Sequence, residues 1–250
     1  LPAVPAERVP EVLAKYEGEI QELKIKVAEK GQSLADDIAR VAAARDALPN
    51  ARLKVDANMG YTLAGALDAL RKLCEYDIIY AEQPVASIED MATLRFAIAK
   101  EGLPARIAAD ESIRKAEDPL KVARANAADL MVIKAAPLGG VRRALALVEQ
   151  AQLPAVVSSA LESSVGIGVG ASLAASLPTL KYGCGLGTVS LMAEDVTDEP
   201  LIARDGFMDL RAIVPSPQRL ERLATDEQTR QWWVERVTAC YRVLERACGL

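Results

Sequence analysis

Residues 53–84, LKVDANMGYTLAGALDALRKLCEYDIIYAEQP, contain the pattern that decides the fold. A short apolar strand at 53–56 is followed by a helical pattern at 62–75 and by a second strand at 78–82. Strands that alternate with helices of this length are typical of βαβ units with parallel strands. The two strands end in carboxylates, Asp56 and Glu82. The segment therefore predicts a parallel sheet with acidic side chains at the carboxyl ends of its strands.

The same strand-and-helix unit recurs along the rest of the chain. Further strand patterns lie at residues 23–27, 106–110, 130–134, 155–159 and 181–185. Strands repeated at intervals of roughly 25–30 residues favour a closed TIM-type barrel over an open doubly wound sheet. No Gly-x-Gly-x-x-Gly follows the first strand, so a dinucleotide-binding fold lacks its usual signature. We therefore predict an α/β fold, a modified TIM barrel of the (β/α)7β type whose first strand is truncated.

The composition argues against several classes of function. The net charge of −5 has the wrong sign for a nucleic-acid groove, and no apolar run is long enough to span a bilayer. The start of the chain lacks the pattern of a secretory signal. We therefore expect a cytoplasmic protein without nucleic-acid or membrane partners. No feature of the sequence predicts an oligomeric state.

The chain contains no histidine and four scattered cysteines. The lack of histidine excludes serine and cysteine triads with a histidine base, and histidine–zinc sites. The cysteines show no C-x-x-C spacing, which indicates reduced thiols. Any chemistry therefore depends on Lys, Asp, Glu, Ser or Tyr side chains, or on a bound ion.

Five successive predicted strands end in a charged residue, namely Lys26, Asp56, Glu82, Asp110 and Lys134. In a TIM barrel the active site lies at the carboxyl ends of the strands. Side chains alternate along a strand, so Lys24 points into the barrel mouth together with Lys26. Three neighbouring carboxylates repel one another unless a hard cation lies between them. Mg²⁺ prefers six oxygen ligands, so three carboxylates leave positions for water and a small-molecule carboxylate substrate.

The lysines at the two ends of this series would flank the bound substrate from opposite sides. A lysine acts as a base when burial, a metal ion or a neighbouring ammonium group such as Lys24 or Lys54 lowers its pKa. The ion would stabilise the enediolate that forms when a proton leaves the carbon next to a carboxylate. The same charged residues are also compatible with solvated strand ends or structural ion pairs around a phosphate-binding barrel, because barrel mouths are polar.

The sequence around these positions resembles the enolase superfamily. The matching motifs are Lys24-Ile-Lys26, Asp56-Ala-Asn58, Glu82-Gln-Pro84, Ala109-Asp110-Glu111-Ser112 and Val132-Ile-Lys134. A lysine base combined with Mg²⁺ is a known arrangement in this superfamily. The segments at 158–164 and 183–188 resemble the seventh- and eighth-strand loops of members that dehydrate a cyclohexadiene carboxylate in menaquinone biosynthesis.

The resemblance implies a role for each matched residue. Asp56, Glu82 and Asp110 would bind Mg²⁺, with Mn²⁺ as a substitute. Lys26 would remove the α-proton and return it to the departing hydroxyl group in a syn dehydration, whereas Lys134 would stabilise the enediolate without exchanging a proton. We expect contacts to the substrate or to the metal ligands from Lys24, Asn58, Ser112, Ser158 and Ser159. For the serines, ordinary loop capping is an equal alternative.

The pattern also indicates how the chain is divided. Residues 1–214 would form the barrel domain, and residues 215–250 a C-terminal helical segment that packs outside the barrel. In that segment an apolar set shares helical spacing, which predicts core packing of Trp232, Val237, Tyr241 and Leu244. Superfamily members carry an N-terminal capping domain, and we expect it to be absent here.

Other activities fit part of the pattern. N-acylamino acid racemases and dipeptide epimerases of the same superfamily also need two lysines on opposite faces of the substrate. A Schiff-base lyase would use Lys134 as a nucleophile and would not depend on a metal ion. A barrel that only binds a ligand or a partner would keep its properties after the loss of Lys26.

Overall fold

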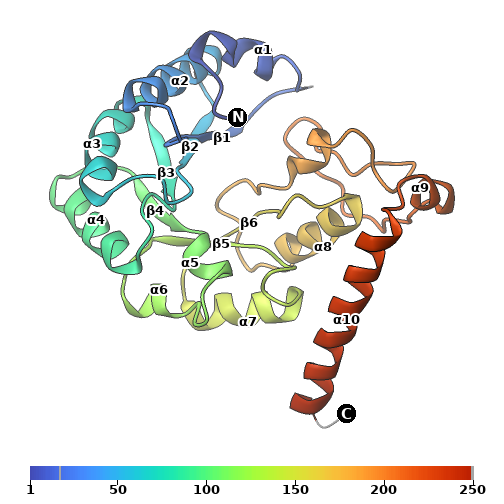
Figure 1. Cartoon of the computed structure of the whole chain (residues 1–250). Coiled ribbons are helices and arrows are strands. Elements are labelled where there is room, and N and C mark those ends of the chain that lie inside the picture. Colours follow the sequence, from blue (N-terminus) through green and yellow to red (C-terminus); the bar gives the residue numbers. More distant parts are fainter. Residues whose placement is uncertain (17, 249–250) are drawn as a thin grey trace.

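The strands form one curled, parallel sheet that carries helices on its outer side. The computed structural model describes residues 1–16 and 18–248. In this part of the chain, six strands pair in sequence order. They are β1 (Glu22–Lys26), β2 (Arg52–Asp56), β3 (Ile78–Glu82), β4 (Arg106–Ala109), β5 (Leu130–Ile133) and β6 (Ala155–Val157). Figure 1 shows the helices arranged around the outside of this sheet.

Helices follow the strands, as the alternating pattern predicts. They are α2 (Leu34–Ala47), α3 (Leu63–Leu73), α4 (Ile88–Lys100), α5 (Glu111–Arg114), α6 (Lys121–Arg124), α7 (Val141–Ala151) and α8 (Ser164–Ala175). Before β1 lie a 3-10 helix, Ala6–Arg8, and α1 (Val9–Leu13); further 3-10 helices are Cys74–Tyr76 and Gly187–Leu191. Ser33 and Asp36 form a capping box at the start of α2.

The barrel-type α/β fold is confirmed, but its last strand is shorter than predicted. Residues 181–185 contribute only an isolated bridge between Ser158 and Gly185. Gly183 and Gly185 offer no side chain to pack in a sheet, and glycine weakens a strand. The predicted strand at 181–185 is therefore replaced by a loop that forms one bridge to Ser158, directly after β6.

The two edge strands of the sheet, β1 and β6, do not pair with each other. Side chains from β1 and β2 instead contact the backbone of the loop at Gly183. Glu22 Oε2 accepts a hydrogen bond from the Gly183 N–H at 2.8 Å, and Lys54 Nζ donates to the Gly183 carbonyl at 2.8 Å. On the free edge of β1, the Leu1 amino group donates to the Lys24 carbonyl at 2.7 Å. The first residue of the chain therefore pairs with the free edge of β1.

Alternation along the strands separates an outer core from an inner one. Leu23 and Ile25 of β1 belong to the large core between sheet and helices. A smaller cluster fills the inside of the barrel and consists of Tyr80, Ala108, Leu130, Val132, Val156 and Tyr182. The charged residues at the strand ends share the inner face with this cluster, so they surround the mouth of the barrel.

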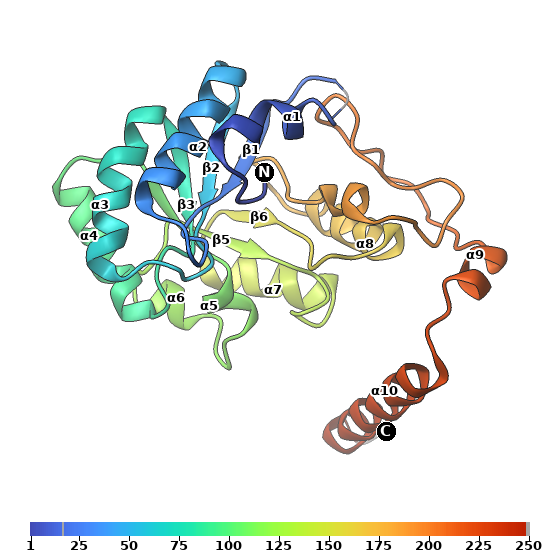
Figure 2. The same ribbon diagram turned by 45° about the horizontal axis from the view of Figure 1, so that its top comes forward.

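The C-terminal part differs from the prediction in its packing. α9 (Pro217–Arg222) is tied to the barrel, because Arg219 Nε donates to Asp198 Oδ1 at 2.6 Å. α10 (Glu227–Cys248) projects away from the barrel (Figure 2). The side chains expected in a core are each more than half exposed: Trp232, Val237, Tyr241 and Leu244. α10 is a helix, as the spacing predicts, but the prediction that these side chains pack in a core is wrong. None of the described helices has the length and hydropathy to cross a membrane.

Candidate metal centre

Three carboxylates lie at the ends of three adjacent strands. Asp56 and Glu82 are the last residues of β2 and β3, and they are register partners. Glu82 also pairs with Ala108 of β4, so Asp110 follows two residues later, where β4 ends and α5 begins. The exposed fraction is 1 % for Asp56 and Glu82 and 2 % for Asp110. The sheet brings the three predicted acidic residues to one edge and buries them there.

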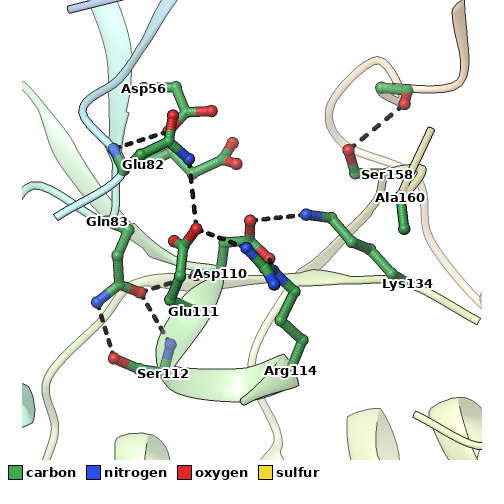
Figure 3. A network of polar contacts seen from close by, with 12 residues as sticks. Asp56, Glu82, Gln83, Asp110, Glu111, Ser112, Arg114, Lys134, Ser158 and Ala160 are labelled. Carbon is green, nitrogen blue, oxygen red and sulfur yellow. Dashed lines mark hydrogen bonds and ion pairs between the residues drawn. The ribbon is translucent and has the colours of Figure 1, made fainter. Parts of the chain in front are cut away.

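Lysine ammonium groups neutralise these carboxylates from two sides. Lys24 Nζ lies 2.7 Å from Glu82 Oε1 and 3.0 Å from Asp56 Oδ2. Lys26 Nζ donates to Asp56 Oδ2 at 2.6 Å. Lys134, which directly follows β5, donates from Nζ to Asp110 Oδ2 at 2.7 Å (Figure 3). Lys26 and Lys134 therefore reach the carboxylate group from opposite ends of the strand series.

Burial shifts the pKa values of these groups. It raises the pKa of Glu82 to about 7; the Lys24 ammonium opposes this rise, whereas Asp56 and Asp110 add to it. Burial would also raise the pKa of Asp56, but Lys24 and Lys26 outweigh it and lower that pKa below its usual value. Burial alone would lower the pKa of Lys24, but the Glu82 and Asp56 carboxylates raise it. The lysine charges thus offset the effect of burial on the pKa of Asp56 but not on the pKa of Glu82, whose negative charge is undercompensated.

The donor set fits a hard divalent cation. As the side chains stand, no three carboxylate or thiol groups among the described residues are arranged to hold a metal ion directly. The ammonium groups of Lys24 and Lys134 bond to the carboxylate oxygens instead. Mg²⁺ takes oxygen ligands, keeps several waters, and so needs few protein carboxylates. Three buried carboxylates, one of them undercompensated, therefore offer the oxygen ligands that such an ion prefers.

Gln83 connects the three strand ends, a role that the sequence analysis did not predict. Its side chain is fully buried, and Oε1 accepts the N–H groups of Asp110 at 3.0 Å and Ser112 at 3.1 Å. Its backbone carbonyl accepts the Met59 N–H at 2.8 Å. The backbone at Gln83 has a φ of +37°, a value that residues other than glycine rarely adopt. The Glu82-Gln-Pro84 motif was the available signal, but it does not show where the amide points.

Glu111 and Arg114 form a second group that the sequence analysis left without a role. Arg114 Nε donates to Asp110 Oδ1 at 3.1 Å, and its Nη2 donates to Glu111 Oε1 at 2.7 Å. Asn58 Nδ2 donates to the same Glu111 oxygen at 3.3 Å. Residues three and four positions apart on a helix are neighbours, so Arg114 reaches Glu111 and Asp110 only if a helix starts at Glu111. The sequence pattern does not predict that helix start.

The remaining predicted contact residues lie in two different surroundings. Asn58 Oδ1 accepts a hydrogen bond from Lys26 Nζ at 2.5 Å, so this residue belongs to the mouth. Ser112 lies behind the carboxylates, where its Oγ accepts from Gln83 Nε2 at 2.8 Å. Ser158 and Ser159 follow β6, and Ser159 Oγ lies 2.8 Å from Thr188 Oγ1. All three serines bond to neighbouring groups of the chain, as loop-stabilising side chains do, and their contact with a substrate stays a prediction.

Comparison with known proteins shows which family this fold belongs to. Residues 6–215 match the family described as Enolase C-terminal domain-like. The chain is 53 % identical to the o-succinylbenzoate synthase of Mycolicibacterium smegmatis over 245 residues, which cover 98 % of this chain and 74 % of the relative. It is 48 % identical to the o-succinylbenzoate synthase of Mycobacterium leprae over 250 residues, which cover 100 % of this chain and 72 % of the relative.

Solved structures with the same fold include two other enzymes. Muconate lactonizing enzyme from Pseudomonas putida matches with a TM-score of 0.76 and 26 % identity, over 89 % of this chain. The chain spans 64 % of the length of that enzyme. A dipeptide epimerase from Enterococcus faecalis V583 matches with a TM-score of 0.66 and 26 % identity, over 79 % of this chain and 56 % of the epimerase.

Proposed function

This chain belongs to the Enolase C-terminal domain-like family, and we propose that it catalyses the Mg²⁺-dependent formation of o-succinylbenzoate, the reaction after which its curated relatives are named. The substrate would be 2-succinyl-6-hydroxy-2,4-cyclohexadiene-1-carboxylate, and the pathway menaquinone biosynthesis in the cytoplasm. The observation that carries the proposal is the series of five charged strand ends, in which Lys26 and Lys134 flank three buried carboxylates.

Each of these residues has a distinct task in the proposed reaction. Asp56, Glu82 and Asp110 would hold Mg²⁺, or Mn²⁺ in its place. When bound, the ion supplies Lewis-acid stabilisation of the negative charge that develops on the substrate carboxylate. Lys26 in its amine form takes the proton from the carbon next to that carboxylate. The C–H electrons pass to the substrate carboxylate, which becomes an enediolate. They then form the new ring double bond as the hydroxyl group leaves with the proton that Lys26 returns, so that water departs and the ring becomes aromatic.

Lys134 acts from the other side of the substrate. Its ammonium group is nearly buried and bonds to Asp110 in this structure. In a low-dielectric mouth, a fixed positive charge stabilises the developing enediolate more strongly than it would in water. Lys134 therefore contributes electrostatic stabilisation without exchanging a proton.

An ultraviolet assay for the aromatic product tests this proposal. We expect product formation that depends on Mg²⁺ and stops in EDTA. Lys26→Ala should abolish product formation but retain Mg²⁺ affinity, measured by calorimetry, because Lys26 is not a ligand. Asp110→Asn should weaken Mg²⁺ binding. If the two variants lose the same property, the roles assigned to them are wrong.

Racemisation or epimerisation is the second candidate function. It is favoured by the two lysines on opposite sides of the carboxylates and by the match to the dipeptide epimerase. The two activities differ in the fate of the substrate. Exchange of the α-proton with deuterated solvent, without loss of water, would identify a racemase or epimerase. Formation of an aromatic product identifies the dehydratase.

A further inference from the structure

Glu111 carries a buried carboxylate oxygen that no group of the described chain satisfies. The residue directly follows Asp110, is the first residue of α5, and is 5 % exposed. Its Oε1 accepts hydrogen bonds from Arg114 and Asn58. Its Oε2 is buried. Among the described residues, it is the one buried side-chain oxygen or nitrogen atom that has no hydrogen-bond partner.

A lone oxygen of this kind is costly and calls for a ligand. A buried polar group that lacks its hydrogen bond destabilises a protein by about 1–3 kcal/mol, and more when it is charged. Buried carboxylate oxygens are therefore nearly always bonded to protein, water or an ion. The unsatisfied Oε2 indicates that the complete site contains a donor that the described chain does not provide.

The neighbouring donors are already engaged. Arg114 directs Nε to Asp110 and Nη2 to Glu111 Oε1. Lys24 bonds to Glu82, and Lys134 bonds to Asp110. Turning any of these groups toward Oε2 would strip another buried carboxylate of its partner. A donor that enters with a bound species would satisfy Oε2 without that loss.

The position of Glu111 relates it to the proposed ion. Two side chains hold its Oε1 by hydrogen bonds. One is Asn58, which lies two residues after Asp56, and the other is Arg114, which also bonds to Asp110. Figure 3 shows the Glu111 carboxylate on the same side of the strand ends as those of Glu82 and Asp110. Mg²⁺ usually keeps several waters when it binds to protein carboxylates, and such waters are strong hydrogen-bond donors.

We propose that Glu111 is a fourth carboxylate of the metal centre, whose Oε2 accepts a hydrogen bond from a water molecule on the ion. This inference rests on the metal site of the proposed function. Glu111 would fix the orientation of that water, while Asn58 and Arg114 fix Glu111. Groups that hydrogen bond to the direct surroundings of a metal ion typically change its affinity 10- to 100-fold when mutated.

Glu111→Gln is the decisive variant, with Glu117→Gln as a matched control at an exposed glutamate near the same helix. The glutamine keeps the size and an oxygen for Arg114 and Asn58, but it places an amide donor at Oε2, which cannot accept from water. We expect the Mg²⁺ affinity of the substrate-free protein, measured by calorimetry, to fall about 10-fold or more for Glu111→Gln. It should stay unchanged for Glu117→Gln.

Thermal unfolding in EDTA separates this role from a purely structural one. Because the glutamine keeps an oxygen for Arg114 and Asn58, the metal-free melting temperature of Glu111→Gln should stay close to that of the wild type. A lower melting temperature together with wild-type Mg²⁺ affinity would overturn the proposal, as would unchanged affinity alone. Glu111→Asp, which keeps the charge but retracts it by one methylene, should also lose affinity, and it provides the comparison if the glutamine variant does not fold.

Two measurements distinguish the proposed role of Glu111 from the proposed function: product formation by the wild type, and the Mg²⁺ affinity of both proteins. Wild-type protein that forms aromatic product with Mg²⁺, combined with unchanged Mg²⁺ affinity in Glu111→Gln, contradicts the role of Glu111 alone. Wild-type protein that binds no Mg²⁺ contradicts both.

Discussion

At the scale of single residues, Gln83 determines whether the three strand ends keep their spacing. Its amide accepts the backbone N–H groups of Asp110 and Ser112, and its backbone carbonyl accepts that of Met59. Gln83→Ala should leave the first two N–H groups buried without an acceptor, at a cost of about 1–3 kcal/mol each. Chemical denaturation in EDTA measures this loss, and calorimetry should show weaker Mg²⁺ binding because Asp110 shifts.

The exposed Gln150 in α7 provides the control for this prediction. Gln150→Ala removes the same side chain from a helix surface and should change neither quantity. A Gln83→Ala protein with wild-type stability and wild-type Mg²⁺ affinity would show that the hydrogen bonds of the amide are replaced by water.

Glu82 gives the metal-free protein a specific pH dependence. Burial raises its pKa from 4.5 to about 7 in the folded state. Between these values the folded state binds more protons than the unfolded state, so the free energy of unfolding falls as the pH rises. The stability from this group is therefore present below pH 4.5 and is lost by about pH 7.

Glu82→Gln isolates this contribution. In EDTA, the variant should be less sensitive to pH than the wild type between pH 4.5 and 7, and more stable than the wild type at the upper end. Denaturation curves at several pH values measure both effects. Parallel curves for the two proteins would mean that the Glu82 carboxylate titrates as it does in the unfolded chain.

Strand periodicity predicts some of these residues and misses others for a physical reason. Asp56, Glu82 and Asp110 are predictable because parallel strands place their carboxyl ends at one edge. The role of Gln83 depends on a left-handed backbone conformation, and that of Glu111 on a helix that starts without a loop. Neither property follows from hydrophobic periodicity, because both arise from packing between elements that are distant in sequence.

At the scale of elements, a buried ion pair between Arg40 and Asp37 fixes the connection from β1 to α2. Both side chains are at most 1 % exposed. Arg40 donates to the Lys26 carbonyl at 2.9 Å and to the Val4 carbonyl at 2.6 Å. Asp37 accepts from Tyr61 at 2.7 Å, so the pair links the end of β1 to the segment before α3. Lys26, the proposed base, thus lies on a strand end whose backbone carbonyl is bonded to Arg40.

Arg40→Met should destabilise the protein by about 3–5 kcal/mol, because it leaves Asp37 buried without its cation. The double variant Arg40→Met/Asp37→Asn should recover part of this loss. Chemical denaturation of both variants tests the pair. If the single variant loses less than the double variant, the ion pair does not stabilise this connection.

The elements also show where periodicity stops being informative. The pattern at 181–185 is compatible with a strand, but two glycines leave it with a single bridge to Ser158. The sequence pattern shows which positions are apolar. It does not show whether the side chains at those positions are large enough to pack against a neighbouring strand. The opposite holds for residues 23–27, whose three apolar residues, Leu23, Ile25 and Val27, all pack in the outer core.

At the scale of the whole molecule, we propose that residues 1–214 form the barrel domain and residues 215–250 a helical segment of its own. α10 supports this division, because its apolar side chains are exposed and it extends from the barrel in both views (Figures 1 and 2). The helical pattern of this segment was predictable, since it depends on local spacing. Its packing was not, because spacing does not specify which surface covers an apolar face.

The tryptophans make this arrangement measurable, because both tryptophans of the chain, Trp232 and Trp233, lie in α10. They are 52 % and 53 % exposed. We expect native tryptophan emission close to that of tryptophan in water, and little change in its wavelength when denaturant unfolds the barrel. Far-UV circular dichroism should follow the barrel in the same samples. A native emission that is strongly shifted to the blue, and that moves to the red together with the dichroism, would contradict an α10 that stands free. In that case a second surface covers the apolar face in solution, and dilution would distinguish a surface of another molecule from one of the same chain, because only association between molecules depends on concentration.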